Sequence, residues 1–136
     1  MNSSSLSASA NSLLPPVWSA SALAQLSPQE NVLACLEVDL DAQLRFAPGL
    51  LIVTDQRVLS ASPGVGTELQ WSSWPIEAGL SMTHTDHAGV GTLSLLNPQQ
   101  CLASWRFTLT HNVTAMRLQE TFAARVEVLT HGASLQ

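Results

Sequence analysis

The sequence contains no lysine, and only 11% of its 136 residues are charged. Ten acidic residues outnumber five cations, and the net charge is -5. Nucleic acids and anionic membranes bind clustered cations, so we expect neither a nucleic acid nor a membrane surface as a partner. A soluble domain usually has about 25% charged residues, so this scarcity predicts that another molecule covers part of the surface. The five cations are all arginine: Arg45, Arg57, Arg106, Arg117 and Arg125.

The two cysteines lack the Cys-x-x-Cys or Cys/His spacing of a metal site. We therefore expect Cys35 and Cys101 to be buried free thiols in a protein from a reducing compartment. The amino terminus has no positive region typical of a secretory signal, and no apolar run approaches the roughly 18 to 20 residues of a membrane-spanning helix. These absences predict a soluble protein, and the length suits one domain.

The motifs of common catalytic sites are missing as well. The sequence has no Gly-x4-Gly-Lys-Ser/Thr loop for phosphates and no Gly-x-Ser-x-Gly nucleophile elbow. The glycine pairs Gly64/Gly66 and Gly89/Gly91 do not lead directly into a helix whose first turn could hold an anion. We therefore predict that this chain is not an enzyme and needs no cofactor.

One short segment contains residue types that bind metals. His84, Asp86 and His87 are side chains that zinc accepts as ligands. A strand over 80–85 followed by a turn at 86–89 does not require the two histidines to face each other. We favour an ordinary polar turn in which Asp86 accepts hydrogen bonds from backbone N–H groups.

The chain divides into a leader, one domain and a short tail. Residues 1–18 have the composition of a disordered or weakly ordered leader, residues 19–132 are predicted to form the domain, and 133–136 are the tail. A short helix is expected over Ser19–Leu26, packing through Leu23 and Leu26. From Asn31 the apolar residues alternate with a period of two, and turn residues punctuate about seven short strands. The candidate segments, eight when the short segment 44–47 is counted, are residues 31–41, 44–47, 50–54, 58–61, 68–74, 80–85, 91–96 and 102–109.

A helical period replaces the strand period near the carboxyl terminus. Over residues 112–130, apolar residues recur at intervals of three and four. Asn112 is a reasonable N-cap, and Gly132 could supply the left-handed residue that ends the helix. The predicted apolar stripe consists of Ala115, Leu118, Phe122, Val126 and Leu129.

Seven antiparallel strands followed by one amphipathic helix predict a mainly β fold, a partial barrel with the helix plugging one opening. This order is similar to the pleckstrin-homology arrangement. A lipocalin-like barrel is the alternative, although it usually has more strands and a larger interior.

A sequence motif supports this resemblance. Residues 49–59, Gly-Leu-Leu-Ile-Val-Thr-Asp-Gln-Arg-Val-Leu, resemble a pattern of bacterial pleckstrin-homology-like domains in which Gly49, Thr54, Asp55 and Arg57 are the anchors. Residues 30–129 resemble the accessory domain that precedes the membrane-spanning and ATPase parts of certain bacterial ABC transporters. The resemblance implies a regulatory or interaction domain at the inner membrane face, with ATP bound only by a downstream domain. Its expected partner is the remainder of the transporter or a dimer mate, so a homodimer is possible.

The resemblance does not extend to phosphoinositide binding. Pleckstrin-homology domains bind inositol phosphates with lysines and arginines in the first strand hairpin, whereas residues 37–45 of this chain contain three acidic residues and one arginine. We therefore expect no direct binding of phosphoinositides.

Two hypotheses of function follow. The first is a noncatalytic interaction domain of an ABC transporter, and the alternative is a free-standing β-barrel module that binds a small molecule or a peptide. We expect Thr54, Asp55 and Arg57 to be mainly structural, with Asp55 accepting from turn N–H groups. Trp71 and Trp74 should lie on opposite faces of one strand, one buried and the other exposed as a candidate interface residue.

Overall fold

The computed structural model describes residues 14–41, 43–63 and 69–134. Residues 1–13 of the expected leader, Gly64, Gly66 and residues 135–136 of the tail lie outside this range. The elements are α2 (Pro16–Gln25), β1 (Val32–Leu40), β2 (Phe46–Thr54), β3 (Arg57–Pro63), β4 (Leu69–Pro75), β5 (Ser81–His87), β6 (Val90–Leu96), β7 (Cys101–Thr108), the 3-10 turn η1 (Leu109–His111) and α3 (Asn112–Ser134).

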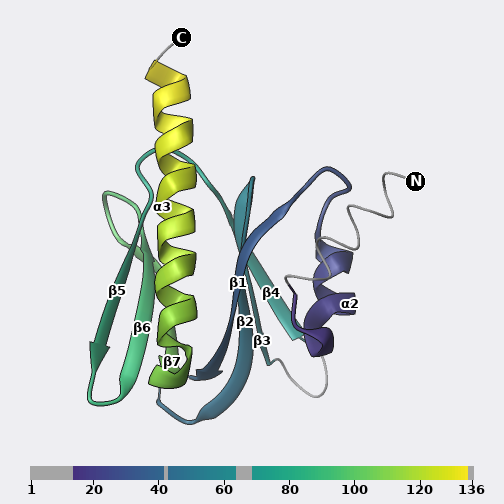
Figure 1. Ribbon diagram of the computed structural model, residues 1–136, viewed down its shortest axis with the longest axis vertical. Helices are drawn as coiled ribbons and strands as arrows, with labels where there is room; N and C mark the ends of the chain where they lie inside the picture. Colours follow the sequence, from purple (N-terminus) through teal and green to yellow (C-terminus); the bar gives the residue numbers. More distant parts are fainter. Residues whose placement is uncertain (1–13, 42, 64–68, 135–136) are drawn as a thin grey trace.

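The strands form one antiparallel sheet in the order β4-β3-β2-β1-β7-β6-β5. The sheet bends where β1 meets β7, because these two strands pair at only one position, Leu40 with Arg106. Strands β5 to β7 therefore diverge from β1 to β4, and α3 runs along the space between the two groups (Figure 1). The predicted partial barrel of seven strands with a carboxyl-terminal helix is confirmed.

One strand is longer than the sequence pattern indicates. The segments 44–47 and 50–54 were expected to be separate, but β2 runs continuously from Phe46 to Thr54 through Pro48 and Gly49. The register shifts at this point, because Val38 pairs with Gly49 and Leu40 with Phe46, which leaves Ala47 and Pro48 of β2 opposite the single residue Asp39 of β1. A bulge of this kind tolerates a residue that cannot donate to the ladder, so the proline does not end the strand.

The inner face of the bent sheet carries the main core, which α3 closes. Ala115, Leu118 and Phe122 of the predicted stripe have no exposed surface, and Val126 and Leu129 pack against the same core. The stripe is therefore confirmed. The core is filled by large side chains, among them Leu36, Leu51, Val53, Leu93, Leu95 and Phe107.

The ends of α3 differ from the prediction. Asn112 is already helical, because η1 precedes it, and its side chain contacts β5 instead of capping the helix. The helix continues through Gly132 to Ser134, so Gly132 does not end it.

A second core lies on the outer face of strands β1 to β4, where α2 packs. Trp18 and Ala22 of α2 are buried there together with Leu14. The helix begins at Pro16, three residues before the expected Ser19, since proline is well suited to the first helical position. Leu23 and Leu26 pack partly against this cluster, as expected. The sheet contributes Val32, Leu50, Ile52, Leu59 and Ala61.

Candidate functional site

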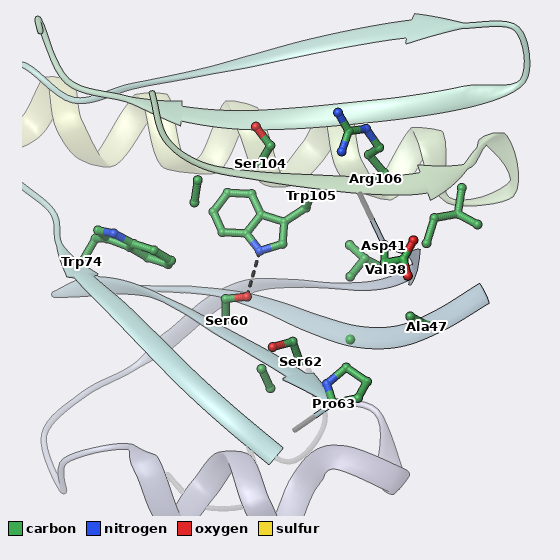
Figure 2. A pocket seen from close by; sticks show the side chains of 14 residues that line it. Val38, Asp41, Ala47, Ser60, Ser62, Pro63, Trp74, Ser104, Trp105 and Arg106 are labelled. Carbon is green, nitrogen blue, oxygen red and sulfur yellow. Dashed lines mark hydrogen bonds between the residues drawn. The ribbon is translucent and has the colours of Figure 1, made fainter. Parts of the chain in front are cut away.

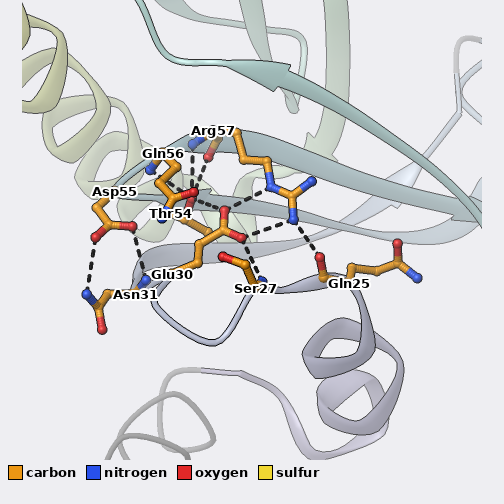
Figure 3. A network of polar contacts seen from close by, with 8 residues as sticks. All are labelled: Gln25, Ser27, Glu30, Asn31, Thr54, Asp55, Gln56 and Arg57. Atoms are coloured by element: carbon orange, nitrogen blue, oxygen red, sulfur yellow. Dashed lines mark hydrogen bonds and ion pairs between the residues drawn. The ribbon is translucent and has the colours of Figure 1, made fainter.

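The turn between β2 and β3 contains the motif residues Thr54, Asp55 and Arg57. Thr54 is fully buried, and its hydroxyl oxygen accepts from the backbone N–H groups of Gln56 and Arg57 at 3.1 and 3.0 Å. Thr54 therefore closes the turn, a role that we had expected of Asp55. Asp55 instead accepts from the backbone and side-chain nitrogens of Asn31, at 3.0 and 3.1 Å (Figure 3).

The partner of Arg57 is Glu30, a residue that we had not singled out in the sequence. Its carboxylate accepts from Arg57 Nε at 2.9 Å and Nη2 at 3.0 Å, and from the Thr54 hydroxyl at 2.6 Å. Burial by itself raises the pKa of Glu30, but hydrogen bonds from Arg57, Thr54 and Ser27 and the charge of Arg57 outweigh it and hold the pKa below 4.5. The carboxylate is thus charged although its side chain has no exposed surface.

The same turn joins both helices to the sheet. Arg57 also donates to the carbonyl oxygen of Gln25 at the end of α2, and Arg125 of α3 donates to that of Asp55 at 2.9 Å. Gly49, the first motif residue, is needed for close packing, since a Cβ there would lie 2.9 Å from the Ala61 carbonyl oxygen. These residues hold the β2–β3 turn, the residues before β1 and both helices together, and their mainly structural role stays a prediction.

The candidate metal ligands do not come together. His84 Nε2 lies 2.7 Å from Asn112 Oδ1, and its ring stacks on Phe107. Alternation along β5 directs His87 to the opposite face, and both Asp86 and His87 are exposed. In the described part of the chain, no group of three His, Cys, Asp or Glu side chains could hold a metal ion.

The tryptophans of β4 lie on opposite faces, as predicted. Trp71 packs against the outer cluster and Trp74 against the inner core. The prediction that one is buried and the other exposed is wrong, since both are partly buried. The reason is that α2 covers the outer face.

Neither cysteine is part of a disulfide in the described residues, as expected, but neither is fully buried. Cys35 is partly buried, and desolvation, with a smaller contribution from the charge of Glu37, raises the pKa of its thiol to about 11. Cys101 is exposed, and its sulfur lies 3.6 Å from the hydroxyl oxygen of Ser104, next to a register shift in the pairing of β6 with β7.

A pocket of about 270 Å³ opens between β7 and the strands β1 to β3 (Figure 2). It lies where β7 leaves β1. Trp74 and Trp105 meet there edge to face, with ring centroids 5.8 Å apart. Trp105 Nε1 donates to Ser60 Oγ at 2.8 Å, so the indole spans the space between β7 and β3.

Two exposed apolar side chains lie close together in sequence where β2 begins. Phe46 is 78% exposed and Leu44 is 51% exposed. Asp41 Oδ1 accepts from the backbone N–H groups of Gln43 and Arg45, both at 2.9 Å, and Asp41 Oδ2 lies 3.2 Å from Arg45 Nε. The hydrogen bond from the Arg45 backbone is the main cause that holds the pKa of Asp41 below its ordinary value. The exposure of Phe46 was not foreseen, because strand alternation alone does not show which face is left uncovered.

No helix among the described residues combines the length and apolarity that a membrane crossing requires. No protein-family model and no curated protein matches the sequence.

Among solved structures, the chain is similar to a DUF1696 family protein with a pleckstrin-homology domain from Shewanella loihica PV-4. The two structures superpose with a TM-score of 0.54 at 16% sequence identity, over 83% of this chain and 94% of that one. Identity at this level shows the fold alone. The chain therefore has a pleckstrin-homology-like fold.

Proposed function

We propose that this chain is a noncatalytic interaction module that docks onto a protein partner through Leu44 and Phe46. The observation that carries the proposal is the 78% exposure of Phe46 at the start of β2. An aromatic ring costs free energy when it is held in water, and aromatic residues and arginine dominate the binding energy of protein interfaces. Arg45 lies between the two apolar residues in the sequence, so the surface contains both an aromatic residue and an arginine.

Local hydrogen bonds beside Leu44 and Phe46 support the same proposal. The Asp41 side chain accepts from the backbone N–H groups of Gln43 and Arg45 and from Arg45 Nε. A preformed surface loses little conformational entropy when it binds. Most of the free energy of burying Phe46 then contributes to the affinity of the complex.

We further propose that the partner is the remainder of a bacterial ABC transporter, or the same domain of a dimer mate, at the cytoplasmic membrane face. The motif at residues 49–59 and the pleckstrin-homology-like fold support this context. Core side chains fill the inner face of the sheet, which favours this context over a free-standing barrel with a ligand cavity inside.

Site-specific photocrosslinking tests the proposal in cells. A photoreactive phenylalanine analogue at position 46 should crosslink to the membrane or ATPase part of the transporter, or to a second copy of this domain. The matched control carries the analogue at Thr83, an exposed position on β5. Equal crosslinking from both positions, or none from position 46, would refute docking through Phe46. Gene sequence beyond Gln136 that encodes no transmembrane region and no ATPase would refute the transporter context.

A further inference from the structure

We propose that the pocket between β7 and β3 receives one uncharged, apolar side chain of the docked partner, whose backbone carbonyl accepts a hydrogen bond from Ser60. This inference rests on the proposed function and adds the chemistry of the segment that is recognised. The occupant is a partner polypeptide with a phenylalanine-like or leucine-like residue at its tip.

The walls of the pocket fit such a side chain. Trp74 and Trp105 form one end, and Val38 and Leu40 of β1 supply aliphatic surface. A space of about 270 Å³ admits one ring or one branched aliphatic group together with the adjacent backbone. Aromatic edges and faces attract a further ring by about 0.5 to 1.5 kcal/mol beyond the burial of its area.

The pocket contains no free charge. Figure 2 shows the Arg106 and Ser104 side chains pointing to the far side of β7, so these residues line the pocket through their backbone. The Asp41 carboxylate at the rim is held by the N–H groups of Gln43 and Arg45. A charged side chain that entered would lose hydration without gaining an opposite charge, which favours a neutral occupant.

Ser60 supplies the polar contact. It is only 8% exposed, and its oxygen accepts the Trp105 indole proton at 2.8 Å. A hydroxyl can also donate, and among the described residues no acceptor bonds the Ser60 proton. Accepting one hydrogen bond strengthens a hydroxyl as a donor, so Ser60 is prepared for a carbonyl oxygen. Ser62, two residues along the same strand, also lines the pocket and is exposed, so it lies on the solvent side.

The test uses N-acetyl-phenylalanine methylamide as the probe and the Trp105 indole N–H resonance, assigned with a Trp105→Phe variant, as the reporter. We expect saturable shifts with a dissociation constant of roughly millimolar order, as the size of the probe allows. The N-acetyl-aspartate analogue should bind at least about 10-fold more weakly, since its charge would be desolvated. This comparison needs only the native chain.

Two variants and one control complete the experiment. Ser62→Phe should fill the mouth and abolish the shifts, whereas Thr83→Phe, outside the pocket, should leave them unchanged. Ser60→Ala should weaken binding about 5- to 10-fold through the lost hydrogen bond. Circular dichroism confirms that each variant is folded.

The outcomes separate this inference from the proposed function. No saturable shift at Trp105, equal affinity for both probes, or undiminished binding to Ser62→Phe would overturn the pocket assignment while the crosslinking at position 46 could still succeed. Loss of that crosslinking with probe binding intact would instead refute the docking proposal.

Discussion

Replacing Arg57 with leucine should destabilise the protein by about 3 kcal/mol. Removing one partner of a buried ion pair usually costs about 3 to 5 kcal/mol, because the remaining charge stays buried. The lower end applies here, since the Arg57 side chain is 29% exposed and Glu30 keeps hydrogen bonds from Thr54 and Ser27. For a chain of this length, this corresponds to a fall in the melting temperature of roughly 10 °C.

The pH dependence identifies the cause of this loss. In the native protein the pKa of Glu30 lies below its ordinary value of 4.5, so the stability that its charge contributes is present above that pH and is lost as the pH falls through the folded-state pKa. Without Arg57, burial should raise the pKa of Glu30, and the buried charge then opposes folding at neutral pH. The difference in the free energy of unfolding between the native protein and Arg57→Leu should therefore be smaller at pH 4 than at pH 7.

Urea unfolding at pH 7 and at pH 4 measures both free energies. The matched control is Arg45→Leu, which removes an exposed arginine paired with Asp41 and should leave the unfolding midpoint unchanged. Two results would refute the assignment of this stability to the ion pair with Glu30. One is a loss of unfolding free energy in Arg57→Leu that is the same at both pH values, and the other is a loss as small as that of Arg45→Leu.

Three further changes test local features. Gly91→Ala should destabilise the protein by about 2 kcal/mol in urea unfolding, because the new Cβ would lie 2.2 Å from a ring carbon of Phe107. An unchanged unfolding midpoint would show that the ring moves freely. Ala88→Asn should raise stability by roughly 0.5 to 1 kcal/mol, since Ala88 has a φ of 53° in a two-residue hairpin turn that favours asparagine before glycine, and a loss would contradict this turn geometry. A thiol reagent at pH 8 should label exposed Cys101 fully before Cys35, because the pKa of the Cys35 thiol is about 11. In Cys101→Ser only Cys35 can react, so rapid labelling of that variant would contradict the protection of Cys35.

The parts of the fold that depend on local periodicity could be predicted from the sequence. The stripe of α3 and the alternation of Trp71 and Trp74 follow from the geometry of a helix and a strand alone. Whether each face is covered depends on another element. The sequence therefore did not reveal that α2 shields Trp71, whereas the continuous apolar run of β2 is now explained by cores on both of its faces.

The polar interactions were harder to predict because they are nonlocal. Glu30 and Arg57 are separated by 27 residues, and nothing in the residues around Glu30 marks it as buried. The path of β2 through Pro48 likewise depends on a bulge in its pairing with β1. A buried acid that meets an arginine after a turn becomes visible only when the pairing of β1 with β2 is known.

Stability and proposed docking are assigned to opposite ends of one strand. Thr54, at the end of β2, donates to Glu30, which lies just before β1. Phe46, at the other end of β2, contributes almost nothing to the core. Because Phe46 is 78% exposed, its identity can change at little cost to folding. The motif residues therefore constrain the fold and do not determine the partner. Residues at the Phe46 end of β2 and in the adjoining pocket can change with the partner while the fold stays the same.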